Sequence, residues 1–109
     1  MFAGIARANI SDQDAKLIQA AENGNLMKVQ TALAEGADLN VKATDGTTAL
    51  MLASEKGNME IVSLLIEKGA DVNIKNDFDK TALLYAQEQD HVEIARLLEK
   101  AGAKEEKTK

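Results

Sequence analysis

The chain has 109 residues, of which 45% are hydrophobic, and its formal net charge is -5 at pH 7. This length suits a single domain with a thin but continuous core, and the acidic balance disfavours a sequence-independent grip on nucleic acid phosphates. Cysteine is absent, which excludes a disulfide framework, a thiolate nucleophile and a cysteine-based zinc site and agrees with a cytoplasmic protein.

The first ten residues, MFAGIARANI, are expected to form an N-terminal arm. Their apolar stretch is short and contains Arg7, so it does not match a secretory signal. Nowhere does the sequence approach the roughly 18 consecutive apolar residues of a membrane span. We therefore expect no membrane partner.

The first repeating unit is predicted over residues 11–43. Asp14 is the candidate N-cap of a helix near residues 15–22, and a second helix is expected near residues 26–35. Gly36 follows where a helix end favours a left-handed residue. Three positions that are apolar in the next unit are polar or small here, namely Lys28, Thr31 and Ala32. Because one face of an end unit meets water, this pattern predicts an N-terminal capping unit.

The second unit, residues 44–76, is predicted to be the central one. Thr48 can cap a helix that runs to about Glu55, and its core candidates are Leu50, Leu52 and Ala53. The next helix, near residues 59–68, carries the most apolar run of the chain, which comprises Ile61, Val62, Leu64, Leu65 and Ile66. These close-set apolar residues predict a wide buried face, as a unit covered on both sides requires.

The third unit is predicted over residues 77–104. Asp79 and Asp90 stand where the central unit has Gly46 and Gly57. The exchange is tolerable because aspartate adopts a positive φ more readily than most residues.

The last helix, near residues 91–100, has Glu99 at the position of Ile66 in the central unit. A charge at this position indicates a solvated outer face and therefore a C-terminal capping unit. Residues 105–109 form a charged tail that we expect to be disordered.

A single period of 33 residues relates the three units. It links Gly36, Gly69 and Gly102, and it also links Thr48-Ala49-Leu50 to Thr81-Ala82-Leu83. A fixed period of this size is the signature of a solenoid, in which each unit buries its apolar face against its neighbours.

The pattern that runs from Asp45-Gly46 through Gly57-Asn58 to Gly69-Ala70-Asp71-Val72-Asn73 resembles an ankyrin repeat. The resemblance covers about residues 11–104. It implies an all-α solenoid of three helix–turn–helix repeats joined by β-turn or hairpin-like loops.

The chain departs from the family at one motif. The usual Thr-Pro-Leu-His appears here as Thr48-Ala49-Leu50-Met51, and the chain contains no proline. Alanine remains a good helix former at a first turn. The missing histidine is expected to weaken the side-chain hydrogen bonding between adjacent repeats, and with it the stability of the fold.

Few residues could carry chemistry. His91, the single histidine, is expected at a helix start where ankyrin repeats often have one, which favours a structural role over catalysis or metal binding. A catalytic carboxylate pair needs one pKa raised by burial, whereas the dense carboxylates of the last unit fall on predicted turns and exposed helix faces. These carboxylates are Asp77, Asp79, Glu88, Asp90 and Glu93. We expect no enzyme activity, no cofactor and no metal.

In proteins resembling this one, partners bind to the projecting turns and to the exposed face of the first helix of each repeat. Carried over to this chain, that surface comprises Lys42, Thr44, Asp45, Thr47, Glu55 and Lys56 from the middle unit. The last unit contributes Lys75, Asp77, Phe78, Lys80, Tyr85, Glu88 and Gln89, and the first contributes Ser11, Asp12, Asp14, Glu22 and Asn23.

Two aromatic residues stand out on this surface. Phe78 occupies the position that Asp45 has in the previous turn, and an exposed phenylalanine there suits an interface anchor. It could equally fold back on the last unit as a local plug. Tyr85 either shares the concave face with Phe78 or packs between repeats with its hydroxyl at the edge.

The sequence therefore predicts a non-catalytic module that binds a protein with a basic or mixed-charge surface and binds no nucleic acid. One alternative is a small inhibitor or immunity-type protein that occludes a basic protein surface. Another is a self-associating structural module. We expect a monomer, with a weak homodimer as the alternative.

Overall fold

The computed structural model describes residues 11–104. The predicted N-terminal arm, residues 1–10, and the predicted tail, residues 105–109, lie outside the described residues. The described part of the chain contains six α-helices and no strand. These helices are α1 (Asp12–Asn23), α2 (Leu26–Ala34), α3 (Ala49–Lys56), α4 (Met59–Glu67), α5 (Ala82–Glu88) and α6 (Val92–Lys100).

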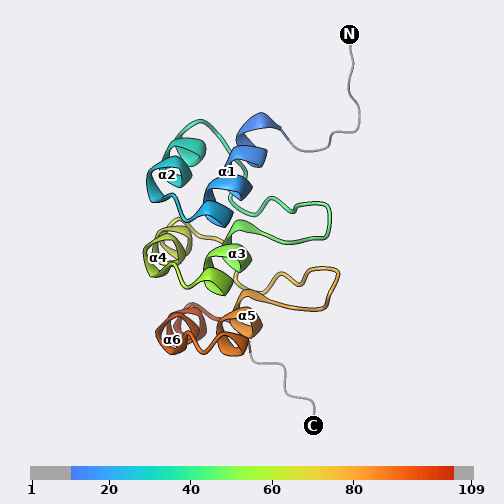
Figure 1. The fold of residues 1–109 in the computed structure, drawn as a ribbon, viewed down its shortest axis with the longest axis vertical. Coiled ribbons are helices and arrows are strands. Elements are labelled where there is room, and N and C mark those ends of the chain that lie inside the picture. The colour runs from blue at the N-terminus through green and yellow to red at the C-terminus, as the bar shows by residue number, and fades with distance from the viewer. Residues whose placement is uncertain (1–10, 105–109) are drawn as a thin grey trace.

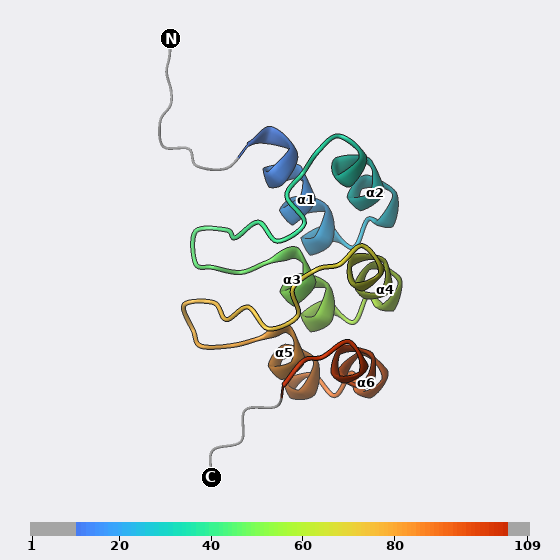
Figure 2. The same cartoon turned by 180° about the vertical axis from the view of Figure 1, so that it is seen from behind.

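The helices form three pairs that stack as layers. Figure 1 shows α1, α3 and α5 in one column and α2, α4 and α6 in a second column beside it. The connections between layers are long turns that project from the α1, α3 and α5 column (Figure 2). The predicted all-α helix–turn–helix solenoid is confirmed.

The first helix begins three residues earlier than expected. Ser11, and not Asp14, is its N-cap, because the Ser11 hydroxyl accepts a hydrogen bond of 3.1 Å from the Asp14 amide. A serine followed three residues later by an acidic residue matches a capping box, and Asp12 and Asp14 in the first turn complement the helix dipole. The prediction of Asp14 as the cap was wrong.

The other helix ends follow the sequence closely. Thr48 caps α3 through a hydrogen bond of 3.2 Å from the Met51 amide to its hydroxyl, as predicted. Gly36 has a φ of 100° after α2, as its place at the helix end required. Asp79 and Asp90 adopt φ values of 64° and 60°, so both stand in the left-handed region that glycine occupies in the preceding layer.

The core is a thin row of aliphatic side chains that runs through all three layers. Leu50 and Ala53 are buried, as expected, but Leu52 is only half-buried. The buried stripe of α4 is also narrower than predicted and consists of Ile61, Val62 and Leu65. Leu64 and Ile66 flank this stripe and are half-buried, because only one side of α4 faces the packed helices.

Neighbouring layers are joined by side-chain to backbone hydrogen bonds in the turns that follow α2, α4 and α6. Within the first layer, the Asp14 carboxylate of α1 accepts such a bond from the Asp38 amide at 2.6 Å. The Asn40 and Asn73 side chains accept equivalent bonds from the amides of Asp71, at 2.8 Å, and Lys104, at 3.0 Å. The two asparagine bonds connect the repeats although the sequence lacks the expected histidine of the first helical turn.

Candidate functional site

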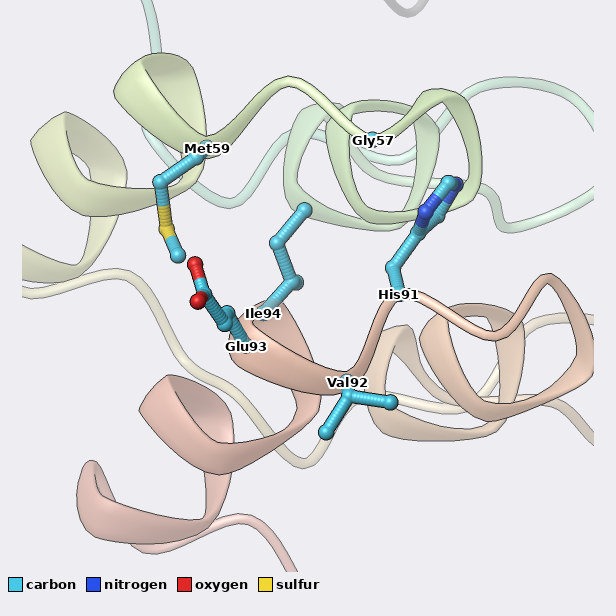
Figure 3. A pocket seen from close by; sticks show the side chains of 6 residues that line it. All are labelled: Gly57, Met59, His91, Val92, Glu93 and Ile94. Atoms are coloured by element: carbon cyan, nitrogen blue, oxygen red, sulfur yellow. The ribbon is translucent and has the colours of Figure 1, made fainter.

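His91 has the structural position that its sequence context predicted. Its ring precedes α6, and Nε2 lies 3.1 Å from the Glu55 carbonyl oxygen at the end of α3. Figure 3 shows the ring pointing toward the turn at Gly57. A Cβ on Gly57 would come within 2.7 Å of this ring, so the glycine is needed for the close approach of the two layers. His91 therefore joins the third layer to the second.

The surroundings of His91 offer no metal site. The shallow hollow beside it is lined by Gly57, Met59, His91, Val92, Glu93 and Ile94 (Figure 3). Among residues 11–104, no group of three or more histidine, cysteine or acidic side chains is placed to hold a metal ion. Glu93 is the one carboxylate in the lining, and one carboxylate beside a hydrogen-bonded histidine does not make a ligand set.

The two projecting turns form the most distinctive surface of the molecule. We name residues 43–47, between α2 and α3, the first tip, and residues 76–80, between α4 and α5, the second tip. The tips lie side by side in both views (Figures 1 and 2). The Asp77 amide donates a hydrogen bond of 2.8 Å to the Asp45 carbonyl, which joins one tip to the other.

The structure brings part of the predicted binding set together at these tips. Thr44, Asp45, Thr47, Asp77, Phe78 and Lys80 lie within them, and Lys42 and Lys75 immediately precede them. Tyr85 and Glu88 on α5 are connected to the second tip by hydrogen bonds. Glu55, Lys56 and Gln89 lie at the opposite ends of α3 and α5, away from the tips.

The first tip is closed by its own carboxylate. The Gly46 amide donates to the Ala43 carbonyl at 2.8 Å, and the Ala43 amide donates to the Thr47 carbonyl at 2.9 Å. The Asp45 carboxylate then accepts the Thr47 amide at 3.1 Å. The hydrogen bonds that Thr47 gives through its side chain and backbone hold the pKa of Asp45 below its ordinary value.

The second tip has the same backbone turn but a different side chain closes it. The Asp79 amide donates to the Asn76 carbonyl at 2.9 Å, and the Asn76 amide donates to the Lys80 carbonyl at 3.0 Å. The Asn76 side-chain oxygen accepts two further bonds, from the Phe78 amide at 2.9 Å and the Lys80 amide at 3.1 Å. Asn76 is only 6% exposed, so its polar atoms are used inside the tip.

The Asn76 side chain also connects the tip to its neighbours. Its nitrogen donates to the Tyr85 hydroxyl at 2.8 Å and lies 3.4 Å from the Thr47 hydroxyl of the first tip. Our sequence reasoning missed this residue. The signal was present, because an asparagine two residues before Phe78 fits an Asx turn, in which the side chain bonds the backbone two residues on.

The two aromatic residues have different environments. Phe78 is 64% exposed and lies outside the core, so the local-plug alternative is wrong. Tyr85 is half-buried against the core with its hydroxyl bonded to Asn76, as expected for a residue that packs at the edge between repeats. The Lys80 ammonium lies 5.5 Å from the centre of the tyrosine ring, which further covers it.

The two lysines at the second tip, Lys80 within it and Lys75 just before it, lie against carboxylates. The Lys80 ammonium bonds both carboxylate oxygens of Glu88, at 2.8 and 2.9 Å, and this contact raises the pKa of Lys80. Lys75 lies 3.8 Å from Asp79 in a more exposed pair. The surface around Phe78 is therefore acidic on balance.

In the described part of the chain, no helix is long and apolar enough to cross a membrane. Comparison with known proteins gave a family match. The family model described as "Ankyrin repeats (3 copies)" matches residues 17–109. No curated protein matches the chain.

Proposed function

The chain belongs to the ankyrin-repeat family, and from this we propose that it is a non-catalytic module that binds a protein partner through its two tips and the adjoining face of α3 and α5. Ankyrin repeats are generally protein–protein interaction modules. The partner that we propose has a basic or mixed-charge surface.

The observation that supports this proposal is the exposure of Phe78. Phe78 is 64% exposed on a hydrogen-bonded turn, so most of its apolar surface is in contact with water. A second protein surface that covers the ring would bury this apolar area and so favour binding. Aromatic residues ringed by polar groups are the usual centres of binding energy in interfaces. Asp77 and Asp79 flank Phe78 in the second tip, and Asp45 lies in the first tip, hydrogen-bonded to the Asp77 amide.

The same surface also suits an inhibitor that occludes a basic protein surface. The net charge of -5 favours this second candidate, because long-range attraction would accelerate association with a basic protein. An inhibitor is expected to hold a single partner tightly, with an association rate that falls steeply as salt is added. A module with several partners would show weaker and more varied binding.

Capture from a lysate of the source cells tests the proposal. The wild-type protein is compared with Phe78→Ala and with Met27→Ala, which removes another highly exposed apolar side chain, from α2. We expect a partner that binds the wild type and Met27→Ala but is lost with Phe78→Ala. Equal helicity and melting temperature of the three baits exclude unfolding as the cause.

Sedimentation of the purified protein at high concentration completes this test. A monomer agrees with the proposal. Equal loss of the partner from both variants, or its retention by both, would contradict the role of the tips. Capture of nothing, together with a concentration-dependent dimer, would show that the chain is a self-associating structural module instead.

A further inference from the structure

The two tips close the same backbone turn with different side chains. In each, the backbone amide of the fifth tip residue, Thr47 or Lys80, must find a side-chain acceptor. The first tip supplies it from its third residue, Asp45. The second tip supplies it from its first residue, Asn76. The third residue of the second tip, Phe78, is thus released from closing the turn, and its side chain can project to solvent.

The amide group of Asn76 is used completely in this arrangement. Its oxygen accepts the Phe78 and Lys80 amides, and its nitrogen faces the hydroxyls of Tyr85 and Thr47. A carboxylate at this position could accept the same amides but could not donate to Tyr85 without a proton. The Phe78 and Lys80 amides can only donate, so they fix which way the Asn76 amide faces, and the bond to the tyrosine hydroxyl then holds this side chain against α5.

The side chains in and around the second tip carry a net negative charge. Residues 75–80 and the two acidic residues that they contact, Asp45 and Glu88, contain four carboxylates against two lysines. Both lysines lie against carboxylates of this set. A surface that covers Phe78 thus meets an excess of negative charge at its rim.

We propose that the second tip is a pre-organised aromatic anchor that enters an apolar, phenyl-sized pocket with a lysine- or arginine-lined rim on the protein partner. Asn76 and Tyr85 act as positioning residues, which hold the tip in place. This inference rests on the proposed protein-binding function. It adds the shape and charge of the partner's site and the residues that prepare the tip.

A synthetic host with this chemistry tests the anchor without the natural partner. Neutral β-cyclodextrin has an apolar cavity that accepts a phenyl ring, and the derivative with amines at its rim adds the positive charge. Amide shifts of residues 77–79 in ¹⁵N NMR titrations locate the binding and give the dissociation constants. Met27→Ala serves as the matched control for an exposed apolar side chain elsewhere.

We expect the aminated host to bind the second tip about three- to tenfold more tightly than the neutral host at low ionic strength. High salt should remove most of that difference, since it screens exposed charges. Phe78→Ala should abolish binding of both hosts at the tip, and Met27→Ala should not change it. Equal affinity for the two hosts would overturn the cationic rim, and unchanged binding by Phe78→Ala would overturn the anchor.

Tyr85→Phe tests the positioning role, because it keeps the ring and removes only the hydroxyl that Asn76 bonds. Hydrogen exchange at the Phe78 and Lys80 amides should accelerate about tenfold, whereas exchange at Thr47 in the first tip should not. Host affinity should fall about two- to fivefold as the tip loses its pre-organisation. Unchanged exchange at both second-tip amides would overturn the roles of Asn76 and Tyr85.

These outcomes are separable from those of the lysate experiment. The host titrations measure the presentation and charge of Phe78 whether or not a natural partner is captured. Failure to capture a protein would overturn the proposed function, while a neutral-host preference would overturn only the partner chemistry inferred here.

Discussion

The first and second tips share one backbone turn, and their differences follow from what lies beyond each. The second tip packs against the first, so a Cβ on Gly46 would lie 3.1 Å from the Asn76 Cα. The equivalent residue of the second tip, Asp79, has a full side chain at a φ of 64°. The fourth residue of the first tip must lack a side chain because the second tip packs against it. The fourth residue of the second tip has no such neighbour and can carry a side chain.

The largest expected effect on stability comes from adding one methyl group to the first tip. Gly46→Ala places a Cβ at a φ of 83° and against the backbone of the second tip, so it should lower the free energy of unfolding by about 2 kcal/mol. Asp79→Ala, at the equivalent position, should change it by less than about 1 kcal/mol. Urea denaturation of both variants measures the difference, and equal losses would refute the dependence on the neighbouring tip.

A smaller effect is expected from removing the side chain that closes each tip. Asn76→Ala leaves the Phe78 and Lys80 amides without their side-chain acceptor in a buried place and should cost about 1–2 kcal/mol of unfolding free energy. Asp45→Ala removes one bond in a more exposed place and should cost about 0.5–1 kcal/mol. Thermal unfolding ranks the two, and the reverse order would show that Asn76 is not central to the second tip.

The smallest expected effect is a pH response that only the first tip shows. Its closing group is a carboxylate whose pKa is lowered in the folded protein, so this group stabilises the fold above its ordinary pKa of 3.8. The stabilisation should be lost as the pH falls below 3.8 and through the lower pKa of the folded state. The amide of Asn76 does not titrate, so the second tip should keep its closing bond.

An NMR titration into acid measures this response at the two equivalent amides. The Thr47 amide should shift and exchange faster at low pH, while the Lys80 amide should keep its bond to Asn76. Asp45→Asn should remove the response of Thr47. A matching transition at both amides would mean that acid unfolds the protein as a whole. It would contradict the expected difference in pH response between the two tips.

Much of this fold could be predicted from the sequence because a solenoid repeats its signals. The 33-residue period places Gly36, Thr48 and the apolar run of α4, and each of these lies where its spacing indicated. The errors came from local competition. Asp14 was the single cap considered, whereas the helix uses the Ser11 hydroxyl three residues earlier.

The site was harder to predict because its geometry is not repeated. Phe78 was identified by its departure from Asp45 in the previous turn, but its direction depended on Asn76, which has alanine as its counterpart. The bond from Asn76 to Tyr85 joins residues whose proximity exists only after α5 packs beside the tip. Which predicted residues contact a partner stays a prediction.

The two aspartates at positive φ also bear on how such an array could lengthen. In the first and second layers, Gly24 lies against Asn58 and Gly57 lies against His91, and each of these contacts comes from the layer that follows. Asp90 occupies the same place in the third layer. Duplication of this repeat would bring a new layer against the Asp79 and Asp90 side chains. A longer descendant of the chain would therefore need glycine at both positions before another unit could stack.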